Sequence, residues 1–287
     1  MKDRRNPALG NRAMRFFYGT AAGRVMMQAM LRSGAPRLMA AYMRSSLSRG
    51  MVRRYIRRYH ISMDDFREQK YRNFASFFIR EKDCPMDDGD PGHLISPCDG
   101  LLSAFPIEEN GSFAIKNSHY RLRDLVDDPA LAEQYRGGLC LIFRLRANDY
   151  HRYAFVADGY IGASHYIEGQ LHSVQPIACD AYPVYRLNRR CWHLLETEEF
   201  GPLVQIEVGA MAVGGIFTET ENARVSRGQE MGHFELCGST IVLLIQKDRV
   251  ALRQELWDAL REQREIEVHR GMWIGEKSPA SLLTPHS

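Results

Sequence analysis

A serine that follows a glycine, in the triplet Gly238-Ser239-Thr240, has the clearest chemical potential in this chain. It opens an apolar run, 241–245, that predicts a buried strand. Glycine has no side chain to hinder attack on its carbonyl carbon, and it tolerates the strained backbone that such attack needs. The Ser239 hydroxyl could therefore act as a nucleophile on its own chain as well as on a substrate. The triplet by itself is more often a turn that enters a strand.

Three further side chains are of the types that accompany a nucleophilic serine. Asp99 lies in a tight turn with the sequence Ser-Pro-Cys-Asp-Gly, His151 follows a predicted strand, and His172 lies in Gly-Gln-Leu-His-Ser. A carboxylate, an imidazole and a hydroxyl are the set that provides a nucleophile, its base and a group that orients the base. They span about 140 residues, so only a folded β body could bring them together. Each one also fits an ordinary role, as a turn aspartate or a buried histidine.

Short motifs follow one another at residues 73–80, 95–100, 149–152, 200–202, 208–214, 228–234, 238–240 and 275–276. They include Asn-Phe-Ala-Ser-Phe-Phe-Ile-Arg, Ser-Pro-Cys-Asp-Gly, Asp-Tyr-His-Arg and Val-Gly-Ala-Met. In these motifs and in their order, from about residue 71 to residue 277, the chain resembles the phosphatidylserine decarboxylases, a pyruvoyl-dependent family. The first 60 residues are similar only in character, as a membrane-associating helical region.

The resemblance implies that the chain cleaves itself between Gly238 and Ser239. Ser239 would attack the Gly238 carbonyl and shift the acyl group from nitrogen to oxygen. Loss of the Ser239 α-proton would then eliminate the ester, and hydrolysis of the resulting dehydroalanine would give ammonia and an N-terminal pyruvoyl group. The products would be a β chain, 1–238, and an α chain, 239–287, that remain paired. The pyruvoyl cofactor would condense with the amine of phosphatidylserine and withdraw electrons as CO2 leaves, so that phosphatidylethanolamine is formed.

One position departs from the family pattern. Family members commonly read Tyr-His-Arg-x-His, with the second histidine as the base of self-cleavage, and this chain has Ala154 there. By resemblance, Asp99 would orient and charge-stabilise the histidine base. Three alternatives remain for that base: His151 serves alone, His172 shares the work, or the chain matures poorly. His151 is also the candidate for the decarboxylation step, because the first histidine of the motif is retained.

The charge is unevenly distributed along the chain. Residues 1–60 hold Lys2 and thirteen arginines against Asp3, a net charge of +13, whereas the remainder has 24 basic and 34 acidic residues, a net charge of −10. A basic segment on an acidic body predicts a polyanionic partner. Nucleic acid is not expected, because no aromatic-basic strand module or zinc pattern accompanies the charge.

Two helical stretches, 13–31 and roughly 37–60, make up this basic segment. The second stretch has arginines on one face: Arg53, Arg54, Arg57 and Arg58. The first stretch supplies apolar surface: Phe16, Phe17, Tyr18, Met26, Met27, Met30 and Leu31. This composition favours helices that lie in the headgroup layer of an anionic membrane. The alternative is a helical cap whose apolar stripe packs on the body.

The rest of the composition bears on where in the cell the protein is expected. No 18-residue apolar stretch predicts a spanning helix, and the N-terminus has no signal-peptide pattern. The six cysteines include no CxxC pair, which predicts free thiols in a reducing cytoplasm and no metal site. We therefore expect a peripheral protein on the cytoplasmic face of the cell membrane, with a homodimer as a further possibility.

The fold expected is α+β: a helical, basic, membrane-associating region, 1–90, and a mainly antiparallel β catalytic domain of two packed sheets, 91–287. The clearest expected elements are a helix over 62–82, strands over 139–145, 203–213 and 240–246, and helices at about 129–136 and 251–264.

Two functions of different classes fit these observations. The first is the decarboxylation of phosphatidylserine after self-cleavage. The second is a cleavage-defective, membrane-bound phospholipid-binding homologue without catalysis, which the loss of the histidine at Ala154 would produce. A pyruvoyl enzyme acting on a soluble amino acid fits less well, because such a substrate gives no reason for the basic helices.

Overall fold

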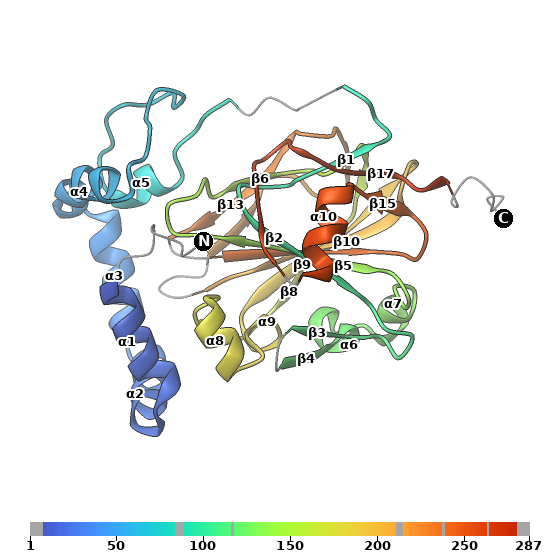
Figure 1. Cartoon of the computed structure of the whole chain (residues 1–287). Helices are drawn as coiled ribbons and strands as arrows, with labels where there is room; N and C mark the ends of the chain where they lie inside the picture. The colour runs from blue at the N-terminus through green and yellow to red at the C-terminus, as the bar shows by residue number, and fades with distance from the viewer. Residues whose placement is uncertain are drawn as a thin grey trace.

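The computed structural model describes residues 8–83, 89–115, 118–210, 215–236, 239–262 and 264–279. Gly238, one half of the predicted cleavage site, lies outside the described residues, as do Cys84 and Cys237. Figure 1 shows the N-terminal helices gathered at one side of a β body. The α+β class predicted from the sequence is confirmed.

The first helices are shorter than the periodicity predicts. Thr20 accepts a hydrogen bond from the Gly23 N–H with its side-chain oxygen, so it caps one helix and separates it from the preceding one. Gly23 also permits close passage of the two helices, since a Cβ there would lie 1.9 Å from the Phe16 carbonyl oxygen. The helices are α1 (Ala8–Gly19), α2 (Ala21–Arg32), α3 (Ala35–Arg44), η1 (Ser46–Ser48), α4 (Arg49–Tyr59), α5 (Phe74–Phe78), α6 (Leu122–Val126), α7 (Pro129–Glu133), α8 (Pro176–Ala181), α9 (Val184–Leu187) and α10 (Gln254–Arg261).

The helix expected over 62–82 is wrong except for its last part, α5. Asn73 caps α5 through a reciprocal pair of hydrogen bonds with Ser76, which begins the helix at Phe74. The residues before it form a loop that is closed by an antiparallel bridge between Phe66 and Lys82. This pairing joins residues 16 positions apart, so a local helical pattern could not reveal it.

The strands follow the apolar runs closely. Strands predicted over 139–145 and 240–246 are observed as β5 and β14, each within one residue. The strands are β1 (His93–Ile95), β2 (Gly100–Pro106), β3 (Ser112–Ile115), β4 (Ser118–Arg121), β5 (Leu139–Leu145), β6 (Arg152–Ala154), β7 (Gly159–Ile161), β8 (His165–Ile167), β9 (Arg190–Thr197), β10 (Gly201–Val208), β11 (Gly215–Thr218), β12 (Ala223–Val225), β13 (Glu230–Glu235), β14 (Ser239–Ile245), β15 (Val250–Leu252), β16 (Ile266–Val268) and β17 (Trp273–Lys277).

A nine-stranded antiparallel sheet dominates the described part of the body, with the order β12-β7-β9-β10-β14-β5-β2-β16 and β8 also paired with β9. Strand β14 lies in the interior of this sheet, between β10 and β5. In the register of these pairs, Ser239 lies opposite Leu145 and Thr240 lies opposite Val208. The predicted nucleophile therefore starts a central strand.

One face of the large sheet packs against two smaller sheets, β11-β13-β6 and β1-β17-β15. Side chains such as Ile241 and Leu243 from β14 meet Tyr153 and Phe234 in this layer. The body is thus antiparallel and layered, as expected, but the layer that covers this face consists of two three-stranded sheets. Ser239 has the same strand parity as Ile241 and Leu243, so its side chain belongs to this inter-sheet face.

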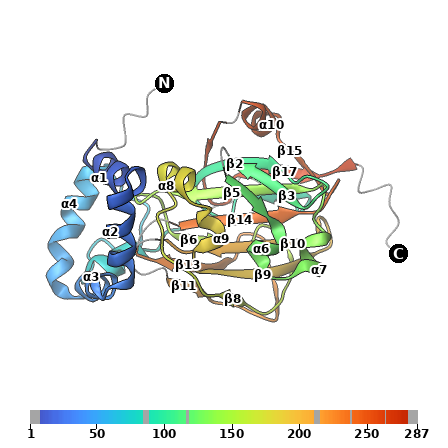
Figure 2. The ribbon, with the colours of Figure 1, turned by 90° about the horizontal axis from the view of Figure 1, so that it is seen from below.

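The opposite face of the large sheet is covered by the hairpin β3-β4 and by helices α6 to α9. Helices α1 and α2 extend this layer, and Figure 2 shows α8 beside α1, between the N-terminal helices and the sheet. Tyr18 and Met27, counted above as surface for lipid, are 2% and 1% exposed and belong to this core. Part of the apolar stripe therefore packs on the body.

Other apolar side chains of the N-terminal helices remain exposed. Seven of the ten large apolar side chains that are exposed in the described residues lie between residues 16 and 47: Phe16, Val25, Met26, Leu38, Met39, Tyr42 and Leu47. Arg53, Arg54, Arg57 and Arg58 on α4 are exposed as well. No helix among the described residues has the length and apolar character needed to span a bilayer.

Candidate active site

Ser239 lies at the first position of β14 and is 1% exposed. All seven residues of β14 are buried, because the strand has a paired neighbour on each side and a covering layer on each face. The sequence encodes this position as a continuous apolar run with no alternation, and a hydroxyl pair, Ser239 and Thr240, marks its start. A rigid central strand therefore fixes the serine.

His151 provides the imidazole that faces this serine. It precedes β6, and its Nδ1 lies 3.2 Å from Ser239 Oγ, while its Nε2 lies 3.1 Å from the Arg146 carbonyl oxygen. A carbonyl oxygen can only accept, so Nε2 carries the proton and donates it to Arg146. Nδ1 is then the unprotonated nitrogen, and the Ser239 hydroxyl donates to it. This tautomer has the arrangement of a general base beside its nucleophile.

A short turn holds the Arg146 carbonyl in place. The Asp149 carboxylate accepts hydrogen bonds from the Arg146 backbone N–H, at 2.7 Å, and from its guanidinium, at 2.8 Å. The Asp149 backbone N–H in turn donates to the Arg146 carbonyl oxygen at 3.0 Å. Asp149 is 7% exposed, so these bonds are shielded from water. A carboxylate thus orients the His151 ring, but it does so through a backbone carbonyl.

The surroundings of His151 keep the ring neutral. It is fully buried, and the Phe78 ring lies over it with 4.1 Å between centroids. Burial, and then the nearby Arg80 guanidinium, lower the pKa of His151 from 6.5 to about 3. Arg80 is itself buried, and burial lowers its pKa; its guanidinium lies over the Phe66 and Phe77 rings. The ring is therefore neutral at physiological pH, and the lone pair of Nδ1 faces the serine hydroxyl.

Asp99, the expected orienting carboxylate, has other partners. Its Oδ1 accepts a hydrogen bond from the Arg270 N–H at 2.8 Å, and its Oδ2 lies 3.2 Å from Lys82 Nζ. The described residues contain no hydrogen bond between Asp99 and His151. Both ring nitrogens of His151 are already engaged, so the structure does not bring these two predicted residues into contact.

Ala154, where the family motif has its second histidine, is fully buried on β6. Its backbone N–H donates to the Pro97 carbonyl oxygen at 2.8 Å, so it lies against the turn that holds Asp99. A methyl group cannot link that turn to the serine by hydrogen bonds. The pairing of Asp99 with Lys82 is consistent with an aspartate that has no imidazole partner.

His172 lies in a separate group of buried side chains. Its Nε2 lies 2.5 Å from Gln170 Oε1, and its ring stacks on Tyr182 at 4.8 Å between centroids and meets Tyr18 edge-on. Asn188 binds its backbone on both sides. Burial lowers the pKa of His172, as it does for His151. In the described part of the chain, no hydrogen bond joins His172 to Ser239.

No chemical role for Asp149, Arg146 or Arg80 was predicted from the sequence. An available signal was the short spacing Arg-x-x-Asp-x-His, which places a base directly after a turn closed by an ion pair. Arg80 ends a motif that was noted only for the resemblance. Its proximity to His151 depends on the packing of α5 against the turn after β5, which no local pattern shows.

Comparison with known proteins decides the family. The family model described as phosphatidylserine decarboxylase matches residues 71–272. The chain belongs to the phosphatidylserine decarboxylase family. The resemblance predicted from the motifs is therefore confirmed, and the chain is classed among the carboxy-lyases.

Relatives in several clostridia extend the match. Phosphatidylserine decarboxylase proenzyme 2 of Clostridium acetobutylicum is 34% identical over 270 residues, which cover 93% of this chain and 92% of that protein. Phosphatidylserine decarboxylase proenzymes of Clostridium perfringens and Clostridium novyi are 37% and 32% identical, over 81% and 93% of this chain and 82% and 94% of their own lengths. Coverage of 93% reaches well into the first 60 residues, where the motifs alone indicated likeness only in character.

Proposed function

We propose that this protein converts phosphatidylserine to phosphatidylethanolamine and CO2, using a pyruvoyl group that it makes by cleaving itself between Gly238 and Ser239. The relatives, which are named phosphatidylserine decarboxylase proenzymes, support the reaction. The observation that supports self-cleavage in this chain is the buried pair of Ser239 Oγ and the unprotonated His151 Nδ1, 3.2 Å apart. It supplies a base despite the alanine at position 154.

In the proposed cleavage, His151 takes the hydroxyl proton as Ser239 Oγ attacks the Gly238 carbonyl carbon. The C–N bond breaks, the Ser239 nitrogen takes a proton, and an ester joins Gly238 to the serine side chain. Removal of the Ser239 α-proton forms a carbon–carbon double bond and expels the Gly238 carboxylate. Water then replaces the nitrogen of the dehydroalanine, which releases ammonia. Atoms balance with one water consumed and one ammonia released.

The residues around Ser239 fit a pyruvoyl group at the start of β14. When present, that group supplies an electrophilic ketone, which binds the substrate amine and accepts the electron pair left by CO2. The chain's own residues would position and shield it: the central strand fixes its location, and Phe78 and the inter-sheet layer exclude water. At Nδ1, which lies 3.2 Å from Ser239 Oγ, His151 would transiently accept a proton and pass it to the carbon that CO2 leaves.

The N-terminal helices support a peripheral location on an anionic membrane, which we assign to its cytoplasmic face. Exposed apolar side chains such as Leu38 and Leu47 lie on the same helical region as the exposed arginines of α4. Each arginine near an anionic surface would contribute about 1 kcal/mol. Vesicle flotation tests this: binding should require phosphatidylserine or phosphatidylglycerol and should weaken at high salt. Equal binding to purely zwitterionic vesicles would contradict it.

The intact mass of purified protein tests the central proposal. We expect two chains of about 27 and 6 kDa, in proportion to 238 and 49 of the 287 residues of a 32.9 kDa precursor. The small chain should be about 17 Da lighter than one that starts with serine, because ammonia is lost. Ser239→Ala should remain a single chain. A single chain in wild-type protein that decarboxylates phosphatidylserine would overturn the proposal.

Ala154 favours one second function, a phospholipid-binding homologue that neither cleaves nor reacts. The same mass measurement separates the two, because a pyruvoyl terminus forms only in the enzyme. Uncleaved wild-type protein that binds vesicles and releases no CO2 from phosphatidylserine would establish this second function.

A further inference from the structure

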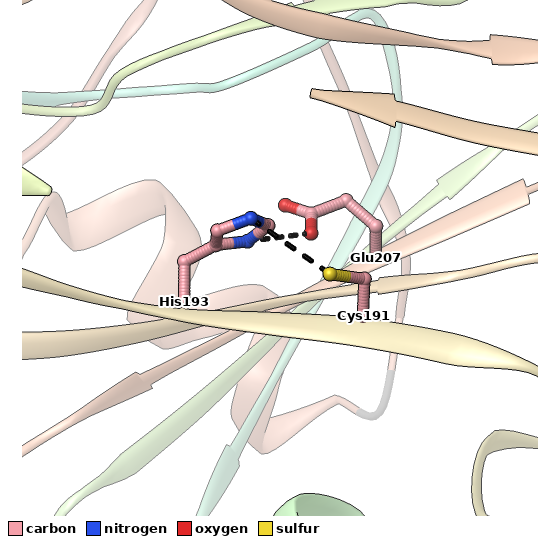
Figure 3. Close-up of side chains that lie close together, drawn as sticks. All are labelled: Cys191, His193 and Glu207. Atoms are coloured by element: carbon pink, nitrogen blue, oxygen red, sulfur yellow. Dashed lines mark hydrogen bonds and ion pairs between the residues drawn. The ribbon is translucent and has the colours of Figure 1, made fainter. Parts of the chain in front are cut away.

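Three side chains that the proposed reaction does not use form a buried cluster on β9 and β10. Cys191 and His193 are two positions apart on β9, so they share a face, and Glu207 on β10 lies directly opposite Cys191. Figure 3 shows the thiol, the imidazole and the carboxylate pointing toward one another. All three residues have 0% exposure. A thiol, an imidazole and a carboxylate are the side chains that bind zinc in proteins.

The donor atoms are close enough to share one ion. One donor from each side chain lies within 4.8 Å of the donors of the other two. Cys191 Sγ is 3.8 Å from His193 Nε2, and Glu207 Oε2 is 3.1 Å from His193 Nδ1. Ligands bound to a tetrahedral zinc at about 2.0–2.3 Å lie about 3.3–3.7 Å from one another. Shifts of about 1 Å would therefore place all three around one ion.

Two of the atoms that face the centre of the cluster lack hydrogen-bond partners. His193 Nδ1 and Glu207 Oε2 are buried without one, although they lie close together, because their contact is not aligned for a hydrogen bond. A buried carboxylate oxygen in this condition is costly unless a cation lies nearby. An ion between the two atoms would satisfy both.

The outer atoms of the same side chains are already held. His193 Nε2 lies 2.7 Å from Ser164 Oγ, and Glu207 Oε1 accepts a hydrogen bond from Gln205 Nε2 at 2.9 Å. Metal-binding histidines and carboxylates have such outer partners, which fix the ring and leave the inner atoms for the metal. Nδ1 and Oε2 thus remain as the atoms of these two side chains that can bind the metal, and Cys191 Sγ, which now lies 3.8 Å from Nε2, would move toward them on binding.

We propose that Cys191, His193 and Glu207 bind one divalent cation of the zinc type. A thiolate and a carboxylate around a dipositive ion with a neutral imidazole leave the buried site without net charge. Sulfur and imidazole ligands favour Zn²⁺ over Mg²⁺ or Ca²⁺. Three protein ligands leave a fourth position for water.

The site would brace the strands beside the nucleophile. Glu207 pairs with Ile241, and Ser239 lies two positions further along β14 on the same face. Diagonal neighbours of this kind are about 7–8 Å apart. The ion would join β9 to β10 through their side chains, in addition to the backbone pairing of the two strands. It would therefore stabilise the layer in which Ser239 and His151 meet.

Metal content of untagged, full-length protein tests the proposal. After passage over chelating resin, we expect about one zinc per wild-type chain and at least a tenfold lower content in Glu207→Gln and in Cys191→Ser. Cys140→Ser, which alters a buried cysteine on β5 outside the cluster, and His165→Asn, on the neighbouring strand β8, should retain the metal. Zinc that is absent from the wild type, or retained by both cluster variants, would overturn the proposal.

Cobalt provides a second measurement that does not depend on how the variants fold. Wild-type protein stripped of metal with a chelator should bind one Co²⁺ and develop a thiolate-to-cobalt charge-transfer band in the near ultraviolet. Zinc should abolish the band and raise the melting temperature of the stripped protein. Absence of the band in folded wild-type protein would also overturn the proposal. Self-cleavage is scored separately by mass, so this outcome leaves the proposed function untouched.

Discussion

Two buried histidines in this protein have similar surroundings and different chemistry. His151 and His172 both lie against aromatic rings, and burial lowers the pKa of both. His151 directs its unprotonated nitrogen at the Ser239 hydroxyl and donates its proton to a backbone carbonyl. His172 has an amide oxygen at one nitrogen, and its other nitrogen, Nδ1, has no partner among the described residues.

The difference shows that burial and a lowered pKa do not make a base. What matters is which group faces each ring nitrogen, because that fixes the tautomer and the direction of proton transfer. The geometry of His151 suits proton transfer from Ser239, whereas His172 packs against Tyr18 and Tyr182. On this basis we infer that His151 serves alone, one of the alternatives that the sequence left open.

The largest expected effect comes from replacing each of the two histidines in turn with alanine. His151→Ala should slow self-cleavage at least about 100-fold, since a positioned base contributes 10²–10⁴. His172→Ala should cleave at close to the wild-type rate but melt at a lower temperature, because a packed aromatic contact is lost. The fraction of cleaved chain, followed over time on a gel, measures both. Slow cleavage in His172→Ala with an unchanged melting temperature would reverse the assignment.

A smaller effect is expected from the turn that orients His151. Asp149→Asn removes the charge that binds the Arg146 guanidinium and backbone, so the carbonyl acceptor of His151 should loosen. We expect cleavage about tenfold slower, from a less well-oriented base. Glu267→Gln is the matched control, because it removes the other ion pair of Arg146 and should change the rate less than twofold. Equal effects of the two variants on the cleavage rate would show that the Asp149 turn does not orient His151.

The pKa of His151 also predicts how stability depends on pH. Its folded value of about 3 lies below the ordinary 6.5, so the unfolded chain binds a proton that the folded chain does not. Stability should therefore fall as pH drops below 6.5, by about 2 kcal/mol between pH 7 and pH 5 from this group. Comparing urea unfolding of Ser239→Ala with that of Ser239→Ala/His151→Asn isolates the contribution, since both remain uncleaved. Identical pH slopes in the two proteins would contradict the lowered pKa.

The smallest expected effect comes from a change in the group of side chains around His172. The Tyr18 hydroxyl accepts a hydrogen bond from the Ser173 N–H at 2.9 Å, next to His172. Tyr18→Phe leaves that buried N–H without a partner and should reduce the free energy of unfolding by about 1 kcal/mol. The cleavage rate should not change. A slower cleavage rate in Tyr18→Phe would show that the side chains around His172 contribute to self-cleavage.

The sequence predicted those parts of the fold that local pattern determines. Strands β5 and β14 were predicted correctly because a strand that is buried on both faces has a continuous run of apolar residues. The helix over 62–82 was wrong because the bridge between Phe66 and Lys82 overrides local periodicity. Tertiary pairing of this kind cannot be deduced from spacing.

For the candidate site, residue types were predictable and partners were not. Ser239 and His151 were both named from the sequence, and the structure places them in contact. The partner of Asp99 could not be predicted, because Arg270 lies 171 positions away in the chain. The choice between His151 and His172 as the base depended on which group faces each ring nitrogen. The amino-acid sequence alone does not show that.

The position of β14 has a consequence for what a cut before Ser239 would release. Residues 239–287 contribute β14 and β16 to the large sheet and β15 and β17 to a three-stranded one. Each of the two sheets also contains strands from the preceding part of the chain, and β14 is paired along its length on both edges. The small fragment would thus be interlaced with the large one, and only denaturant should separate them. Maturation would sever the backbone yet leave a single cooperative unit, and a 49-residue peptide made on its own would have no sheet to enter.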